Sequence, residues 1–439
     1  MKSFINHHRY AKMGRQVAPL LLLLSFLAAP PSSAQDYSLE QLQQMAVQHS
    51  RSLQNTRLGI ASAQADRTIA RTNYFPQLSA GVVGFRGFDD LMQSSIAVPG
   101  MGAMDIAMMK KGFVGSLMAV QPIYQGGQIT TGNKLAALQE EVCQLRLKMG
   151  VKETELQVAQ YFWQLISLQA AVTTLDSVDV QLDEVFRLTE QHVKAGTTTR
   201  NDLLRVEHKR QETAAQRLRL ENSISLLRLL LGQLTGIEAD SCRIRPATAF
   251  LTPSAPTTYL QSMDKAIRSR EEYDLSSLNA NAKALNVKME RGKLLPSLAV
   301  GAGGFYQTMD GNGNFNGLVF ATVSVPISAW WGGKHSIRKA KIQQQQAEND
   351  RQDAYEKLSV DIQSAWNNLN EAYAQIEIAR ASLASAEENL RMQRIFHHAG
   401  TTTLTDLLDA VTLFTQSSCG LIDACATYQI RIAEYQRKT

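Results

Sequence analysis

The sequence predicts a mainly helical protein that also carries membrane β-strands, and three observations support this fold class. The segment Ala-Gly-Thr-Thr-Thr occurs at 195–199 and again at 399–403, 204 residues apart, so a unit of nearly half the chain is duplicated. Each copy holds two short apolar segments of strand-like composition. Each copy also holds a long stretch with little or no Gly and Pro, which is typical of a very long helix.

The remainder of the duplication follows from alignment of the two halves. Residues 73–81 match 292–301, and residues 120–127 match 324–333. Each half therefore runs helix, strand, loop, strand, Gly-Gly, very long helix, Thr-rich turn and helix. We expect residues 35–245 to form the first repeat, 257–439 the second, and the Pro-containing segment 246–256 to link them.

Residues 1–34 predict a secretory signal peptide, so we expect the chain to be exported. A basic segment without acids precedes an apolar segment at 20–29 that is too short to span a bilayer, and small residues precede a cleavage site expected after Ala34. The alternative is a retained membrane anchor. The basic residues that cleavage removes are Lys2, Arg9, Lys12 and Arg15. Their loss lowers the formal net charge from +5 to +1, so the charge gives no argument for nucleic acid.

The cysteines do not predict a disulfide scaffold. The chain holds Cys143, Cys242, Cys419 and Cys425, and no two of them form a CxxC pair. Cys419 and Cys425 fall on one expected helix, six residues apart, so they lie on different faces. After residue 34 there is also no run of about 18 apolar residues, the length that a transmembrane helix needs.

The strands are expected at 77–88, 113–124, 297–306 and 318–328, after a first helix over 38–73. Along the last segment, apolar residues at 319, 321, 323, 325 and 327 alternate with mostly small or polar ones. This alternation is typical of a barrel wall with lipid on one side and water on the other. We expect the loop over 87–112 to face solvent.

Prolines, glycines and aromatic residues mark the ends of these strands. We expect the strand–helix junctions at Pro122, Gly126, Gly127, Pro326, Gly332 and Gly333. The aromatic residues near the strand ends, where a membrane-interface belt lies, are Tyr124, Trp330 and Trp331. Ordinary packing is the alternative role of these three side chains.

The stretches 128–194 and 334–398 predict helices on the order of 100 Å long at ~1.5 Å per residue. Apolar residues along the first stretch repeat at heptad spacing, as in a coiled coil. A fibrous coiled coil is the alternative, but it leaves the four strands unexplained.

Each Thr-rich segment predicts a helix–turn–helix. Gly196 and Gly400 suit the left-handed conformation that ends a helix. Thr199 and Thr403 are expected N-caps, and the acids three residues later, Asp202 and Asp406, complete a pattern close to a capping box.

The halves differ three residues beyond these acids. Asp409 shares a helix face with Asp406, whereas the first repeat has Arg205 at the matching position. The adjacent His397 and His398 point about 100° apart on a helix, and no Cys or carboxylate cluster joins them, so no metal site is expected. No phosphate-binding loop or nucleophile–base set is found either, so we expect no enzyme and no cofactor.

Together the duplicated plan, the Pro and Gly-Gly punctuation and the string Gly-Thr-Thr-Thr-Leu-Thr-Asp-Leu-Leu-Asp at 400–409 resemble the TolC family of outer-membrane efflux proteins. The resemblance implies a homotrimer in the outer membrane of a Gram-negative bacterium. Each protomer would give four strands to a shared twelve-stranded β-barrel, continued by a long periplasmic α-helical barrel. It also implies a passive exit duct that works with a periplasmic adaptor protein and an inner-membrane transporter, in efflux or in type I secretion.

The resemblance also implies roles for residues at the turns. It implies adaptor contact at Gly196, Thr197, Thr198, Thr199, Gly400, Thr401, Thr402 and Thr403. It implies a ring of carboxylates at the pore constriction from Asp406 and Asp409. It implies a closed-tip lock at Asp202, Arg205 and His397, in which the Asp202 carboxylate accepts a hydrogen bond from His397, where the family often has Tyr. The alternative function is an exported trimeric coiled-coil structural or adhesin protein with a β membrane anchor. The cargo does not follow from the sequence.

Overall fold

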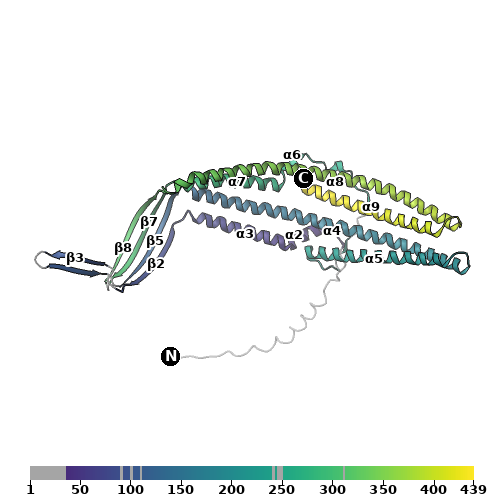
Figure 1. The fold of residues 1–439 in the computed structure, drawn as a ribbon, viewed down its shortest axis with the longest axis horizontal. Coiled ribbons are helices and arrows are strands. Elements are labelled where there is room, and N and C mark those ends of the chain that lie inside the picture. The colour runs from purple at the N-terminus through teal and green to yellow at the C-terminus, as the bar shows by residue number, and fades with distance from the viewer. Residues whose placement is uncertain are drawn as a thin grey trace, which may run out of the picture. The chain divides into compact units, whose positions relative to one another are not determined.

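The structure is a computed structural model that describes residues 36–88, 92–98, 102–108, 111–239, 243–244, 251–309 and 312–439 (Figure 1). It divides into two compact units. The tip unit comprises Met1–Gln48, Val158–Pro253 and Ile378–Thr427, and the sheet unit comprises His49–Gln157, Ser254–Glu377 and Tyr428–Thr439. The expected signal peptide, Cys242 and residues 246–250 of the expected linker lie outside the described residues.

Three long helices run through both units: α4 (Gln128–Lys194), α8 (Ala329–His398) and α9 (Leu404–Lys438). The tip unit adds β1 (Asp36–Tyr37), most of α2 (Leu39–His49), α5 (Arg200–Thr235) and β6 (Arg243–Ile244). The sheet unit adds α3 (Arg51–Thr72), β2 (Gln77–Arg86), β3 (Met92–Val98), β4 (Gly102–Met108), β5 (Lys111–Gln125), η3 (Pro256–Tyr259), α6 (Met263–Arg268), α7 (Glu271–Gly292), β7 (Ser297–Met309) and β8 (Asn312–Ser324). No helix in the described residues is long and apolar enough to cross a membrane.

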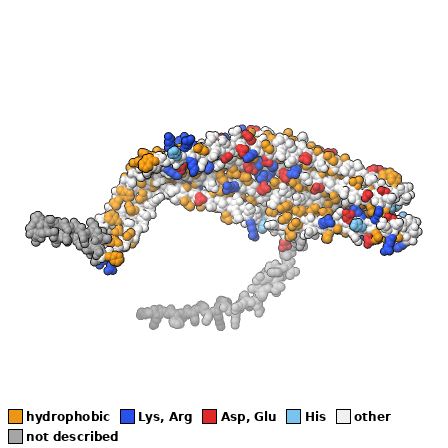
Figure 2. Space-filling model, viewed as in Figure 1, with side chains coloured by type: hydrophobic (Ala, Val, Ile, Leu, Met, Phe, Trp, Pro, Cys, Tyr) orange, Lys and Arg blue, Asp and Glu red, His pale blue; other side chains and the backbone are white. Residues whose placement is uncertain are grey.

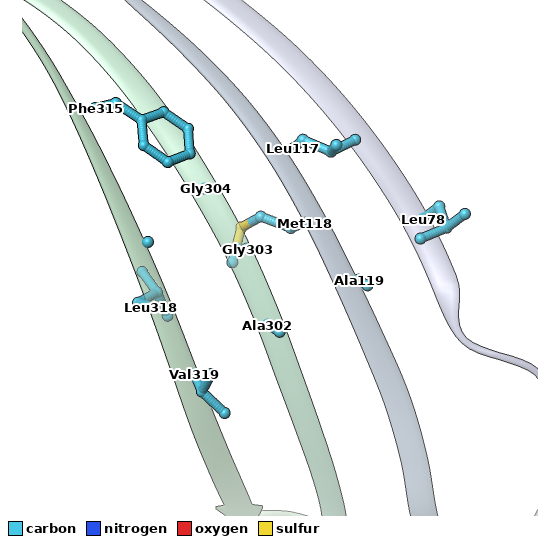
Figure 3. Close-up of a pocket in the computed structure, with 11 residues that line it drawn as sticks. Leu78, Leu117, Met118, Ala119, Ala302, Gly303, Gly304, Phe315, Leu318 and Val319 are labelled. Carbon is cyan, nitrogen blue, oxygen red and sulfur yellow. The ribbon is translucent and has the colours of Figure 1, made fainter.

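The main sheet is antiparallel, with strand order β2-β5-β7-β8 (Figure 1). Its register places Leu78, Ala119, Ala302 and Val319 in one row across all four strands. Figure 3 shows these side chains along a shallow groove of about 540 Å³ that is lined by apolar residues and glycines. The strand alternation expected from the sequence therefore produces one continuous apolar face. Strands β2 and β8 are the two edges of this sheet.

Several expected boundaries need correction. The first helix breaks at Ser50, because this residue leaves the helical conformation and its hydroxyl accepts the Leu53 N–H as the N-cap of α3. The loop expected over 87–112 contains a hairpin, since β3 pairs with β4. The fourth strand lies at Asn312–Ser324 instead of 318–328. It ends before Pro326 because proline lacks the N–H that a ladder needs and also restricts the preceding residue.

The two Gly-Gly pairs have different structures. Gly126 and Gly127 have φ of +59° and +75° and form the junction between β5 and α4, as expected. An added Cβ on Gly126 would lie 2.1 Å from the carbonyl oxygen of Gly292, so these two backbones touch. The matching Gly332 and Gly333 lie inside α8, so their assignment as a junction is wrong.

The structure also places some of the residues expected at strand ends in other elements. Trp330 and Trp331 belong to the first turn of α8 rather than to a strand end, and the Trp330 indole N–H donates to the Leu294 carbonyl at 2.9 Å. Pro122 lies within β5, at an irregularity in its pairing with β7, while Tyr124 remains in the strand. A proline is tolerated at such a bulge because the local ladder bond is already lost.

Buried polar contacts tie together the helices of the sheet unit. The Arg270 side chain is only 5% exposed and bridges Glu272 at the start of α7 to Asp361 of α8, at 2.9 and 2.8 Å. Lys438 of α9 reaches the same Asp361 at 2.6 Å. Because a buried guanidinium needs carboxylate partners, these contacts fix the relative position of three helices within the unit. Cys143, Cys419 and Cys425 are free thiols.

Candidate functional site

The candidate site is the pair of Thr-rich turns in the tip unit. Each turn ends a long helix in the same way. Gly196 has φ of +73° and donates to the Val193 carbonyl, while Thr197 N–H donates to the His192 carbonyl at 2.9 Å. This pair of backbone hydrogen bonds is a Schellman motif. The motif needs a residue that tolerates the left-handed conformation.

The second turn repeats this geometry. Gly400 has φ of +70°, and its N–H donates to the His397 carbonyl at 3.0 Å. Thr401 N–H donates to the Phe396 carbonyl at 2.9 Å. The left-handed glycines expected from the sequence are confirmed at both turns.

Each following helix starts with a capping box. The Thr199 hydroxyl accepts the Asp202 N–H at 3.2 Å, and the Asp202 carboxylate accepts the Thr199 N–H at 3.3 Å. Thr403 and Asp406 make the same exchange, at 3.2 and 3.1 Å. The expected caps are therefore present in both repeats, and each satisfies N–H groups that a helix start leaves unpaired.

Threonine hydroxyls supply further bonds to the two acids. Thr198 donates to Asp202 at 2.7 Å, and Thr402 donates to Asp406 at 3.0 Å. Hydrogen bonds from Thr198 and Thr199 lower the pKa of Asp202, and bonds from Thr403 and Thr402 lower the pKa of Asp406. Both carboxylates are thus held in the ionised form by their own turns.

One apolar cluster supports both turns. It takes residues from α4, α5, α8 and α9, so the two turns belong to one packed body. Leu404, the first residue of α9, and Val206, in the second turn of α5, are both buried in it. The cluster comprises Val178, Leu182, Val206, Leu390, Leu404, Leu407, Leu408, Ala410 and Val411.

The turns themselves are open. Residues 195–197 and 399–401 are exposed, and a Cβ added to Gly196 or Gly400 would meet no atom within 4 Å. A rigid, capped turn with accessible backbone and hydroxyl groups is suited to contact with another protein.

The two residues that distinguish the repeats take different roles. Arg205 of α5 donates to the Thr405 hydroxyl of α9, so it crosses between the two turns. Asp409 is exposed, and it has no hydrogen-bond or ion-pair partner in the described part of the chain. Asp406 is also exposed, but its Oδ2 atom is occupied by its turn.

The hydrogen bond expected between Asp202 and His397 is not formed among the described residues, which is a correction. Asp202 is already bound by the hydroxyls of its own turn, and these local donors are closer in sequence than His397. His397 is partly buried, and burial lowers its pKa below the ordinary value, with further lowering by His398 and His192.

Sequence reasoning missed the contacts between elements. The Gln393 side chain of α8 lies 3.0 Å from the Thr402 hydroxyl, where it is an alternative acceptor to Asp406, and the Arg205–Thr405 bond joins the two repeats. Neither contact has a sequence signal, because each depends on how the helices pack. No group of three or more His, Cys, Asp or Glu side chains that would hold a metal ion occurs in the residues that the structure describes.

A duplicated set of long helices, matched exposed turns and an antiparallel sheet with one apolar face defines the class of outer-membrane channel proteins. The chain belongs to the outer membrane efflux protein family, whose sequence pattern matches residues 42–236 and 269–435. The family consists of outer-membrane channel proteins and not of enzymes. These matches confirm the expected family and place the protein in the Gram-negative outer membrane, reaching into the periplasm.

Individual relatives agree with this assignment. The chain is 24% identical to the outer membrane efflux protein BepC of Brucella suis over 434 residues, which cover 97% of this chain and 89% of that protein. Its fold is similar to that of a membrane protein from Pseudomonas aeruginosa, with a TM-score of 0.77, 16% identity and coverage of 92% and 93%. It is also similar to the outer membrane protein VceC of Vibrio cholerae, with a TM-score of 0.75, 17% identity and coverage of 91% and 95%. The expected fold class is confirmed.

Proposed function

We propose that three copies of the chain form the passive exit duct of a tripartite efflux system. In this proposal the Thr-rich turns dock a periplasmic adaptor protein, and the adaptor connects the duct to an inner-membrane transporter. The single observation that carries the proposal is the pair of matched, open and rigidly capped turns on one packed body. Membership of the efflux family supports it.

The sheet supports the assembly of several copies. It has only four strands in order β2-β5-β7-β8, and four strands are too few to close around water. An exposed strand edge in lipid leaves backbone N–H and C=O groups unpaired, at a cost of several kcal/mol each. Pairing β8 of one copy with β2 of the next removes both edges. Three copies then give a barrel of twelve strands.

Asp406 and Asp409 are proposed to form the selective constriction of the duct. Three positions apart on α9, they share one helix face and are both exposed. Threefold repetition would bring six carboxylates around the passage and favour cations. Asp409 is the stronger contributor because its carboxylate has no partner in the described residues, whereas Asp406 also caps its helix.

Substitution of the exposed turn hydroxyls tests the docking role. Thr197→Glu with Thr401→Glu adds charge and bulk at both turns and spares the Thr–Asp capping boxes, so we expect loss of efflux with trimer and membrane insertion intact. Thr173→Glu with Ser385→Glu is the matched control. These hydroxyls are also exposed and donate to a helix carbonyl, but they lie on the helix shafts.

The measurement is accumulation of ethidium in the native host, with a deletion strain carrying each variant. The wild type and the control pair should lower accumulation, and the turn pair should not. If the turn pair restores efflux as well as the control pair does, the turns are not the adaptor contact. Single-channel conductance of the purified protein in planar bilayers tests the duct separately, because it needs no adaptor.

A further inference from the structure

The start of α8 carries an unbalanced basic stretch. Between Ala329 and Ala347 the helix has four Lys or Arg residues and no Asp or Glu. These residues are Lys334, Arg338, Lys339 and Lys341, and all four side chains are exposed. Figure 2 shows blue side chains gathered at this place, where α8 follows the sheet. We call these four residues the basic stretch.

The basic stretch is not explained by the stability of the protomer. None of its four residues has an ion-pair or hydrogen-bond partner in the described residues. Farther along the same helix, charges are paired, as Arg351 is with Glu348 and Lys357 with Asp353. Basic residues near a helix N-terminus also gain nothing from the helix dipole, which favours acids there.

The neighbouring helix does not neutralise the stretch either. Lys339 borders a groove between α7 and α8 that also contains Glu290, but Glu290 already binds Lys293 at 2.6 Å. Arg291, at the end of α7, adds another exposed basic side chain without a partner in the described part of the chain.

The first repeat shows that the fold does not require these charges. The first 19 residues of α4, Gln128–Arg146, hold two basic and two acidic residues, so they sum to zero. One of these acids, Glu140, is bound by Arg67 of α3 at 2.8 Å. The first 19 residues of α8 sum to +4. The charge therefore belongs to a role that only the second repeat performs.

In the barrel proposed above the sheet lies in the membrane, and the basic stretch follows directly after the end of that sheet. Strand β8 ends at Ser324 and α8 begins at Ala329, so Lys334 and Arg338 are about 8 and 14 Å along the helix from the sheet junction. The headgroup layer on each side of a bilayer is about 5–8 Å thick. Long basic side chains reach toward it because their stems lie along apolar surface while the charge stays in water.

An exposed aromatic side chain marks the same level. Trp331 is 82% exposed and lies two residues from the start of α8. Trp330 is half exposed and held by its bond to Leu294. Tryptophan favours the interface between hydrocarbon and headgroups. Where a chain passes from the hydrocarbon of an anionic membrane into water, tryptophan at the interface is followed by basic residues at the headgroups. Trp330, Trp331 and the basic stretch have this order.

We infer that the basic stretch of α8 binds the anionic headgroups of glycerophospholipids in the periplasmic leaflet of the outer membrane. Lys334, Arg338 and Lys341 share one helix face at spacing i, i+4 and i+7 and form the centre of the surface. Charge complementarity and continuity with the membrane-facing sheet select a lipid partner. The role is separate from efflux, and it rests on the proposed insertion of the sheet in the outer membrane.

The test uses the full mature chain in a neutral detergent. Binding of dansyl-phosphatidylglycerol and of dansyl-phosphatidylcholine with the same acyl chains is followed by energy transfer from tryptophan. The triple variant K334Q/R338Q/K341Q is compared with the control R351Q/K357Q/R391Q. This control removes the same charge from exposed or half-exposed positions, each of which is paired with an acid of α8.

Wild type and control should prefer phosphatidylglycerol. Each basic residue at an anionic surface strengthens lipid binding about fivefold. The triple variant should therefore lose on the order of 100-fold in its preference for phosphatidylglycerol over phosphatidylcholine. In 1 M salt, where the Debye length is about 3 Å, the wild-type preference should also fall. Millimolar inorganic phosphate at constant ionic strength should not displace the dansyl lipid.

Three results would overturn the inference. The first is an unchanged lipid preference in the triple variant. The second is full displacement by inorganic phosphate, which would mean a site for free phosphate. The third is loss of oligomer by light scattering in the triple variant with its lipid preference retained, which would make the surface a contact between copies of the chain.

Discussion

The two Gly-Gly pairs that follow the sheet allow a prediction in which three similar substitutions have different outcomes. Gly126→Ala should be the most destabilising. A non-glycine residue at φ of +59° costs about 1–2 kcal/mol. The new Cβ would also lie 2.1 Å from the Gly292 carbonyl oxygen, and the resulting backbone shift adds about 1–3 kcal/mol. The sum is about 2–5 kcal/mol.

Two neighbouring substitutions separate these causes. Gly127→Ala meets the same left-handed penalty at φ of +75°, but its Cβ has only Thr130 Oγ1 at 3.8 Å, so about 1–2 kcal/mol is expected. Gly332→Ala lies inside α8 with no atom within 4 Å of the new Cβ. It should stabilise by about 0.5–1 kcal/mol, because alanine is the better helix former.

The assay is guanidinium unfolding of the detergent-solubilised protein, followed by helical circular dichroism. Midpoints are compared at a common slope, and unfolding rates are recorded because a membrane oligomer often unfolds irreversibly. The expected order of stability is Gly332→Ala, wild type, Gly127→Ala, Gly126→Ala. If Gly126→Ala were no less stable than Gly127→Ala, the backbone contact with Gly292 would not be real. If Gly332→Ala were destabilising, the helical assignment of the second Gly-Gly pair would be wrong.

Two further predictions concern the tip unit. Asp409→Asn should lower cation preference and weaken block by a trivalent cation in planar bilayers while leaving stability unchanged, since Asp409 has no partner in the described residues; an unchanged reversal potential would put the constriction elsewhere. Acidification from about pH 7.5 to 5.5 should increase amide hydrogen exchange at both turns, after correction for the intrinsic exchange rate. The reason is that burial lowers the pKa of His397 in the folded state, whereas the unfolded state binds a proton at the ordinary histidine pKa. Protonation therefore favours the unfolded state as the pH falls. His397→Gln should remove this pH dependence, and His208→Gln, at an exposed histidine of α5, should not. The capping carboxylates Asp202 and Asp406 stay ionised over this range because their pKa values are lowered. Equal acid sensitivity in both variants would assign the effect to another group.

Local features of the fold were predictable from the sequence because their causes lie within a few residues. A glycine after a long helix, followed by Thr and an acid three positions later, specifies both helix termini, and the structure has both. The break at Ser50 was missed because the apolar spacing continues across it, although serine is a common N-cap. The β3–β4 hairpin was missed because Gly and Ala weaken the alternation that marks a strand.

The two Gly-Gly pairs show where sequence similarity between repeats is a poor guide. Both pairs follow a strand, but only Gly126 lies against another backbone, that of Gly292. This contact comes from a residue 166 positions away, and so no local pattern predicts it. The same holds at the tips, where the bond between Arg205 and Thr405 spans 200 residues. Residue types were sufficient to predict caps, and tertiary contacts required the packing of the helices.

The places where the repeats differ are informative about assembly. The capping boxes are the same in both repeats because every helix start has the same unpaired N–H groups. The repeats diverge at Arg205 against Asp409, at the junction glycines, and at the charge of the helix after the sheet. In the proposed trimer the six repeats form a ring, and identical repeats would give it nearly sixfold symmetry.

The differences between the repeats at these three places reduce that symmetry to threefold. A carboxylate in only one repeat of each protomer, with Arg205 in the other, places acids at alternate positions of the ring and limits their mutual repulsion. A basic stretch in only one repeat likewise places three lipid-binding surfaces around the duct rather than six. Asp409→Arg would make the second repeat resemble the first at this position. It should therefore reverse the ion preference of the duct without altering either capping box, and a cation preference that survives this change would show that the carboxylates at 409 do not line the passage.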